Sequence, residues 1–81
     1  MNPAPQVPER VRLAILEACE AFECHPADLL GASHEPQFVA GRRLIAYRLR
    51  TAGWSLSRIG RVLGRHHTTV LNLLRAGRRG S

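Results

Sequence analysis

Apolar side chains recur at intervals of three and four positions along most of the chain, which is the spacing of an amphipathic helix. The pair Pro8 and Glu9 is a favourable helix start, because proline fits the first turn and a carboxylate is stabilised at the positive end of a helix. The pattern therefore predicts a first helix over residues 9–22. Its apolar face consists of Val11, Ile15, Ala18, Cys19 and Phe22.

Two further helices are predicted before residue 53. Pro26 restarts a short helix whose apolar side is Leu29 and Leu30, and Gly31 ends it. A longer helix is expected over residues 38–52. Its inward positions are Val39, Leu44, Ile45, Leu49 and Ala52, and its outward positions are Arg42, Arg43, Arg48 and Arg50.

Residues 55–75, SLSRIGRVLGRHHTTVLNLLR, are predicted to form two helices joined by a tight turn at Gly64. Ser55 is the expected N-cap of the first helix, and the second begins at residue 66 or 67. Five apolar positions hold the two helices together at a steep angle: Leu56, Ile59, Leu63, Val70 and Leu74. This pattern is typical of a helix-turn-helix, in which the beginning of the second helix enters the major groove of DNA.

The patterns together predict an all-α fold, a compact bundle of four main helices and one short helix. A chain of 81 residues has room for one domain, which we assign to residues 9–76. Residues 1–8 contain three prolines and are expected to be a disordered lead. Residues 77–81 have no apolar anchor and are expected to be a flexible basic tail.

Charge is divided unevenly between the two halves of the chain. All six acidic residues lie within residues 1–35, and ten of the twelve arginines follow without a single acid among them. Arginines without acidic neighbours repel one another unless a polyanion neutralises them, and the phosphate backbone of a nucleic acid does so. The charge pattern therefore indicates a nucleic-acid-binding protein with a net charge of +6.

The helix-turn-helix places short polar side chains where base edges and phosphates are read. A threonine methyl packs on the thymine methyl, a histidine can donate to guanine or phosphate, and asparagine can reach adenine. Arginines on the preceding helices are expected to bind phosphate. The expected DNA contacts are Arg42, Arg43, Arg48, Ser57, Arg58, Arg65, His66, His67, Thr68, Thr69 and Asn72.

The segment SLSRIGRVLGRHHTTVL resembles the signature of domain IV of DnaA, the bacterial replication initiator, whose pattern is approximately SLPEIGxxFGGRDHTTV. FECHPADLLG and VAGRRLIAYRL are similar to two upstream segments of that family, so the resemblance covers about residues 11–76. It implies a helical, Trp-repressor-like fold that binds double-stranded DNA through its helix-turn-helix.

By resemblance, His67 and Thr68 contact bases in the major groove, and Thr69 contacts the backbone. Arg42 and Arg43 are the best matches to a basic-loop arginine that enters the minor groove in the family. Two departures stand out: His66 replaces an aspartate, and the basic-loop arginine aligns on Gly41. We therefore expect a target other than the usual initiator box.

Other kinds of site find less support in the sequence. Cys19, Cys24, His25 and His34 lack a standard zinc spacing, and a catalytic triad would need an acid that residues 36–81 do not contain. No G-x-x-x-x-G-K-[ST] loop occurs, so no nucleotide cofactor is expected. The acidic first helix could instead dock a basic partner, and the basic third helix could lie on a membrane surface, although its apolar side is needed for the core.

The sequence thus predicts a sequence-specific double-stranded DNA-binding protein without enzymatic activity, cofactor or metal. Its expected task is transcription regulation, as an activator that brings RNA polymerase or a co-regulator to a promoter. A replication-control protein that binds initiator-type sites is the alternative, followed by a protein-interaction module. Two cysteines are too few for a disulfide framework, and no apolar run could span a bilayer, so the expected location is the cytoplasm, at the nucleoid.

Overall fold

Helices account for most of residues 8–78, the part of the chain that the computed structural model describes. In chain order they are α1 (Glu9–Phe22), α2 (Pro26–Leu30), α3 (Pro36–Thr51), α4 (Leu56–Leu63) and α5 (His67–Arg78). No strand occurs in this part, which confirms the predicted all-α bundle of four main helices and a short one. Residues 1–7 of the predicted lead and 79–81 of the predicted tail lie outside the described residues, whereas residues 77 and 78 continue α5.

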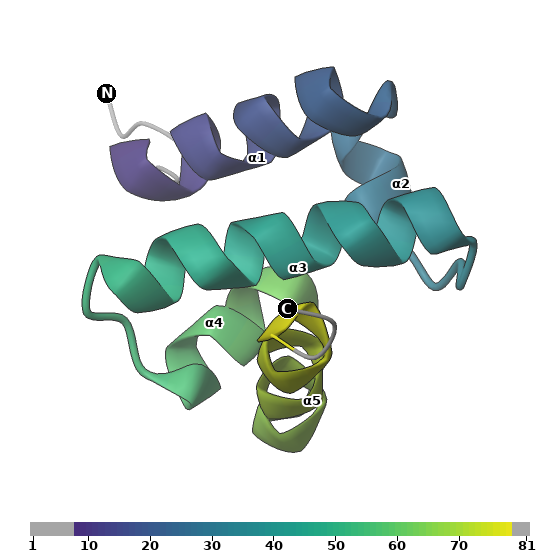
Figure 1. The fold of residues 1–81 in the computed structure, drawn as a ribbon. Helices are drawn as coiled ribbons and strands as arrows, with labels where there is room; N and C mark the ends of the chain where they lie inside the picture. The colour runs from purple at the N-terminus through teal and green to yellow at the C-terminus, as the bar shows by residue number, and fades with distance from the viewer. Residues whose placement is uncertain (1–7, 79–81) are drawn as a thin grey trace.

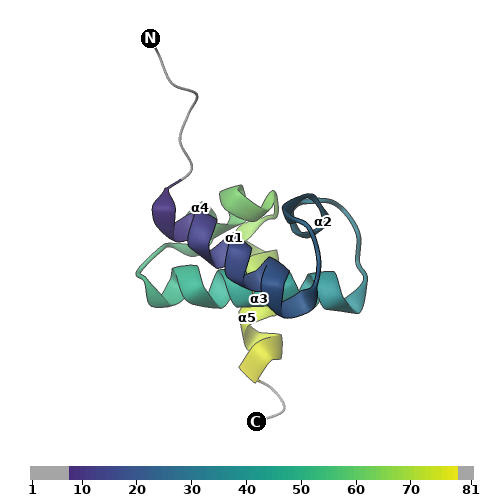
Figure 2. The same ribbon diagram turned by 90° about the horizontal axis from the view of Figure 1, so that it is seen from above.

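Helix α3 is the centre of the bundle. Helix α1 packs along one side of α3, and α4 and α5 pack against the other, as Figure 1 shows. Helix α2 closes one end of the α1–α3 layer. Seen from above in Figure 2, α5 runs transverse to α3 and passes beneath it. The molecule therefore has two opposite faces, one formed by α1 and one by the beginning of α5.

The core joins these layers mostly through apolar positions that the periodicity predicted. Ala14 and Ala46 are buried although they were not predicted, and Leu30, predicted on an apolar side, is exposed. Every helix contributes at least one buried side chain, so no helix is held by local propensity alone. The fully or nearly fully buried apolar residues are Val11, Ala14, Ala18, Leu29, Ile45, Ala46, Leu49, Ile59, Leu63 and Val70. Burial of the valine, leucine and isoleucine side chains among them stabilises a fold by about 1.5–3 kcal/mol each.

The helices begin and end at the capping residues, prolines and glycines of the sequence. The Ser55 hydroxyl accepts a hydrogen bond from the backbone N–H of Arg58 at 3.1 Å, which is an N-cap contact for α4. Pro26 opens α2, and His25 and Asp28 form a reciprocal capping box around its first turn. Gly64 ends α4 in the left-handed region, with φ 66°. Helix α3 begins two residues earlier than predicted because Pro36 provides its first turn, and it ends before Ala52, which is exposed.

Candidate nucleic-acid interface

The helix-turn-helix depends on a close approach between α4 and the chain that leaves it. The backbone N–H of Arg65 donates to the carbonyl of Gly60 at 2.8 Å. A Cβ atom on Gly60 would lie 2.5 Å from the carbonyl oxygen of Arg65, so glycine is required at this position. Gly60 and the left-handed Gly64 together bring the chain round, and α5 begins at His67.

His66 caps the first turn of α5 with its ring. The backbone N–H of Thr68 donates to His66 Nδ1 at 3.3 Å, and the Thr68 hydroxyl lies 2.8 Å from the same nitrogen. The direction of the hydrogen bond between the Thr68 hydroxyl and Nδ1 depends on the ring tautomer. His66 is exposed, so its ring is accessible to a ligand.

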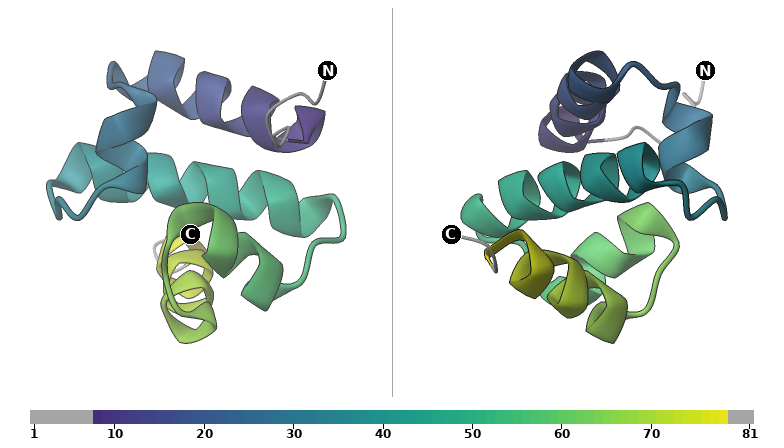
Figure 3. Two further views of the ribbon diagram at one scale, coloured as in Figure 1. Left: turned by 180° about the vertical axis from the view of Figure 1, so that it is seen from behind. Right: turned by 45° about the vertical axis from the view of Figure 1, so that its right-hand side comes forward.

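Five polar residues lie exposed at the beginning of α5. This end of the helix lies on the side of the molecule away from α1 (Figures 1 and 3). The five residues are His66, His67, Thr68, Thr69 and Asn72. The rings of His66 and His67 lie side by side, with centroids 4.2 Å apart. Val70, in the same turn, is fully buried and anchors this end of the helix to the core. The structure thus brings together all five polar residues that the sequence predicted on this helix.

Helix α4 presents two more of the predicted residues. Ser57 and Arg58 are exposed near its beginning. The Arg58 guanidinium stacks on the Trp54 ring, with its carbon atom 3.7 Å from the ring centroid. Sequence reasoning missed Arg61 of α4 and Arg75 of α5, which are also exposed. Their signal was available, because both belong to the arginine-rich, acid-free half of the chain.

Two predicted arginines have donors bound to backbone carbonyls. Arg65 is half-buried and donates through Nη2 to the Gly31 carbonyl at 2.6 Å and through Nη1 to the Leu63 carbonyl at 3.1 Å. Arg43 donates through Nε to the Leu73 carbonyl at 3.0 Å, which ties α3 to α5. Both side chains lie beside the helix-turn-helix, and both help to fix its position on the rest of the fold.

The expectation that Arg42 contacts DNA is wrong for this structure. Only 3% of Arg42 is exposed, and its guanidinium faces the end of α2. Its Nε donates to the Leu29 carbonyl at 2.6 Å, and Nη2 donates to the carbonyls of Asp28 and Gly31 at 3.1 and 3.0 Å. Burial, together with the neighbouring Arg65, lowers the pKa of this guanidinium. The last carbonyls of a helix have no N–H partner within the helix, and Arg42 provides the donors for those at the end of α2.

Gly41, at the position of the basic-loop arginine in the resemblance, has no room for a side chain. A Cβ atom there would lie 2.6 Å from the Leu29 side chain. In the described conformation, therefore, neither position 41 nor position 42 can present an exposed arginine side chain.

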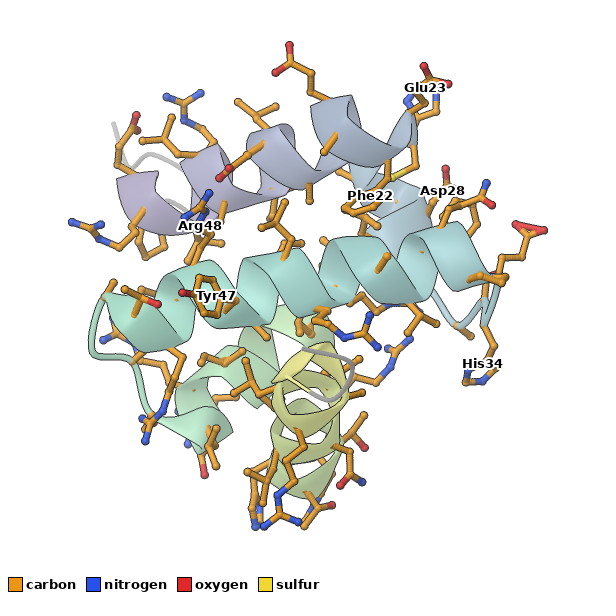
Figure 4. The ribbon with its side chains drawn as sticks, in the orientation of Figure 1. Phe22, Glu23, Asp28, His34, Tyr47 and Arg48 are labelled. Carbon is orange, nitrogen blue, oxygen red and sulfur yellow. The ribbon has the colours of Figure 1, made fainter. Side chains whose placement is uncertain are left out.

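The structure also separates Arg48 from the other predicted contacts. Its guanidinium forms two hydrogen bonds with the Glu17 carboxylate of α1, at 3.0 and 2.8 Å. In Figure 4 Arg48 lies between α1 and α3, on the side of α3 away from α5. The hydrogen bonds from Arg48 lower the pKa of the Glu17 carboxyl. Arg48 thus belongs to the α1 face, and its predicted contact with DNA stays a prediction.

The other titratable clusters are engaged in the fold. His25 and Asp28 form the capping box of α2, and Cys19 and Cys24 are free thiols packed against the core. Burial and the adjacent Cys24 raise the pKa of the Cys19 thiol. Within residues 8–78, no three histidine, cysteine or acidic side chains are grouped closely enough to hold a metal ion. None of the helices in that range combines the length and apolar character that a membrane crossing needs.

A comparison with protein families agrees with the geometry. A family model described as the bacterial DnaA protein helix-turn-helix matches residues 14–76. This range extends from the middle of α1 into the last turns of α5, so it contains the whole helix-turn-helix. Comparison with curated proteins and with solved structures gives no match.

Proposed function

The chain belongs to the bacterial DnaA helix-turn-helix family, and on this premise we propose that it binds double-stranded DNA in a sequence-specific manner. The observation that carries the proposal is the beginning of α5, where five polar side chains are exposed while Val70 is buried beneath them. A rigidly anchored helix end of this kind can enter the major groove and hold side chains against base edges.

The chemistry of the first turn suggests what each side chain offers to DNA. The Thr68 methyl group is available to pack on a thymine methyl, and its hydroxyl, which shares a hydrogen bond with His66 Nδ1, can also bond a base or a phosphate. The exposed ring of His66 can contact a guanine edge or a phosphate. His67 is the other base contact by resemblance, with Thr69 at the backbone and Asn72 one turn further along.

Phosphate binding falls to the exposed arginines around the helix-turn-helix. We assign this role to Arg58 and Arg61 on α4 and to Arg75 on α5. Ser57, which precedes Arg58 on α4, is a further candidate. No acidic residue lies on either helix to compete with a phosphate for these guanidiniums. Each phosphate contact releases counterions, so binding should weaken steeply with salt.

The biological task that fits these features is transcription regulation, with the protein acting as an activator near the nucleoid. When α5 faces DNA, the acidic α1 face points away from it and is accessible to RNA polymerase or a co-regulator. The alternative task is control of replication through initiator-type sites. Genome-wide mapping of bound sites separates the two, because promoter-proximal sites support activation and clusters at the origin support replication control.

Base reading is tested by His67→Ala and Thr68→Ala, compared on a duplex selected from a random pool and on a random duplex. Each substitution should weaken binding to the selected duplex by about 1–3 kcal/mol and leave random-duplex binding nearly unchanged. His34→Ala is the matched control, since His34 is exposed and lies in the loop between α2 and α3. An equal loss on both duplexes would show that the substituted residue does not read bases.

A further inference from the structure

Trp54 is a fixed platform in the connection between α3 and α4. It is the only tryptophan of the chain, and it is half-buried against the core. Its backbone N–H donates to the Leu49 carbonyl at 3.0 Å, and its own carbonyl accepts from Arg50 Nη1 at 2.8 Å. Because both backbone groups and part of the ring are held, the indole has little freedom to move away from the beginning of α4.

The Arg58 guanidinium lies over the Trp54 ring, and in the described part of the chain its N–H donors are not bound to other protein groups. The guanidinium carbon lies over the ring at 3.7 Å from its centroid, and a cation–π contact of this kind does not use up the N–H donors of an arginine. The Arg58 side chain makes no hydrogen bond or ion pair within residues 8–78. Arg43 and Arg65, by contrast, donate to backbone carbonyls. Arg58 is therefore held in position and still able to bind an oxyanion.

We propose that Trp54 is a positioning residue for DNA binding, which orients the Arg58 guanidinium toward a phosphate of the duplex. The inference rests on the DNA-binding function proposed above. A free arginine side chain loses rotamer freedom when it binds phosphate, and the indole removes part of that cost before DNA arrives. Trp54 thereby strengthens binding to any duplex, whatever its sequence.

A double-mutant cycle tests the proposal on the whole chain with a fluorescently labelled random duplex. Trp54→Leu should weaken binding about two- to fivefold, which is the range of an exposed cation–π contact. Arg58→Gln should weaken binding further and make the log–log salt slope shallower by about 0.9. The double variant should bind like Arg58→Gln alone, and Trp54→Phe should retain most of the wild-type affinity.

The matched control is Arg61→Gln, an exposed arginine on the same helix. Trp54→Leu should retain its full effect in the Arg61→Gln background, because Trp54 does not act through Arg61. Equal losses from Trp54→Leu in the wild-type and Arg58→Gln backgrounds would overturn the proposal, since they would mean that Trp54 acts through the fold. No loss at all from Trp54→Leu would overturn it too.

Intrinsic fluorescence provides a readout that does not require a substitution of Trp54. Addition of an unlabelled duplex should change the emission of the single tryptophan, and Arg58→Gln should abolish the change at saturating DNA. An emission change that persists in Arg58→Gln contradicts the proposal. If the wild-type protein binds no duplex, the proposed function and this inference both fail; if it binds but shows no coupling in the cycle, only the inference fails.

Discussion

Replacement of Arg42 with alanine is expected to destabilise the fold and to leave the salt dependence of DNA binding unchanged. Arg42 is 3% exposed, and its guanidinium donates to three backbone carbonyls at the end of α2. Alanine removes all three hydrogen bonds and opens a space between α2 and α3. The effect therefore differs from that of an exposed arginine, whose loss would weaken contacts with phosphate.

The magnitude follows from the hydrogen bonds and the position of their acceptors. A hydrogen bond to a charged group contributes about 1.5–3 kcal/mol, so three would give an upper limit of about 4.5–9 kcal/mol. Water can reach part of the short α2 helix once the side chain is gone, and the buried charge no longer needs to be desolvated. We therefore expect a loss of about 2–4 kcal/mol. A domain of this size melts about 4–8 °C lower for each kcal/mol lost.

Thermal unfolding followed by circular dichroism measures the stability, and binding to a random duplex at several salt concentrations measures the phosphate contacts. Arg58→Ala is the matched control, because it should retain the melting temperature and reduce the salt slope. The reasoning about Arg42 is refuted if Arg42→Ala melts within a few degrees of the wild type and shows a reduced salt slope.

Three further predictions concern the turn, the α1 face and the thiols. Gly60→Ala should cost about 1–3 kcal/mol of stability in thermal melts, because its Cβ would clash with a backbone carbonyl; an unchanged melting temperature would contradict this. The pKa of Glu17 is lower in the folded protein than in the unfolded chain, so its carboxylate stabilises the fold at pH values above the ordinary carboxyl pKa. This contribution is lost as the pH falls through the pKa of Glu17 in the folded state. Glu17→Gln should therefore melt below the wild type at neutral pH and match it in acid; a gap that persists in acid would exclude the ion pair with Arg48. The raised pKa of Cys19 should shift its alkylation rate to higher pH in folded Cys24→Ser than in the same variant in urea, and coincident profiles would argue against burial as the cause.

The helices could be predicted because their signals are local. The apolar spacing, the proline that opens α2, the cap at Ser55 and the left-handed Gly64 act within a few residues of the chain. The beginning of α5 could be predicted for the same reason, since one buried residue, Val70, orients the whole turn. A family resemblance carried by LGRHHTTVL added the expected roles of individual side chains.

The arginines of α3 could not be assigned from periodicity, because four other helices contact this helix. Periodicity divides a helix into one inward and one outward face, and it counts every charged residue as outward. Helices α1, α2, α4 and α5 all contact α3, so Arg42 faces the end of α2 and Arg48 faces α1. Only the tertiary arrangement reveals that carbonyls at the end of α2 need donors.

The stacking of Arg58 on Trp54 was missed for a different reason. The two residues are four positions apart, but Trp54 lies before the N-cap of α4, so helical spacing does not relate them. Their contact depends on the path of the chain through Gly53, whose φ of 97° turns it between α3 and α4. A non-helical turn of this kind has no periodic pattern from which side-chain contacts could be deduced.

The bond from Arg65 to Gly31 has a consequence for protein engineering. Residue 65 precedes α5, yet its guanidinium is anchored 34 positions earlier in the chain. A transplant of α4 and α5 into another scaffold would leave that anchor behind and free the leading end of the transplanted helix. A portable reader derived from this protein should therefore carry α2 with it, and libraries that vary sequence preference should randomise the exposed turn while keeping Arg65 constant.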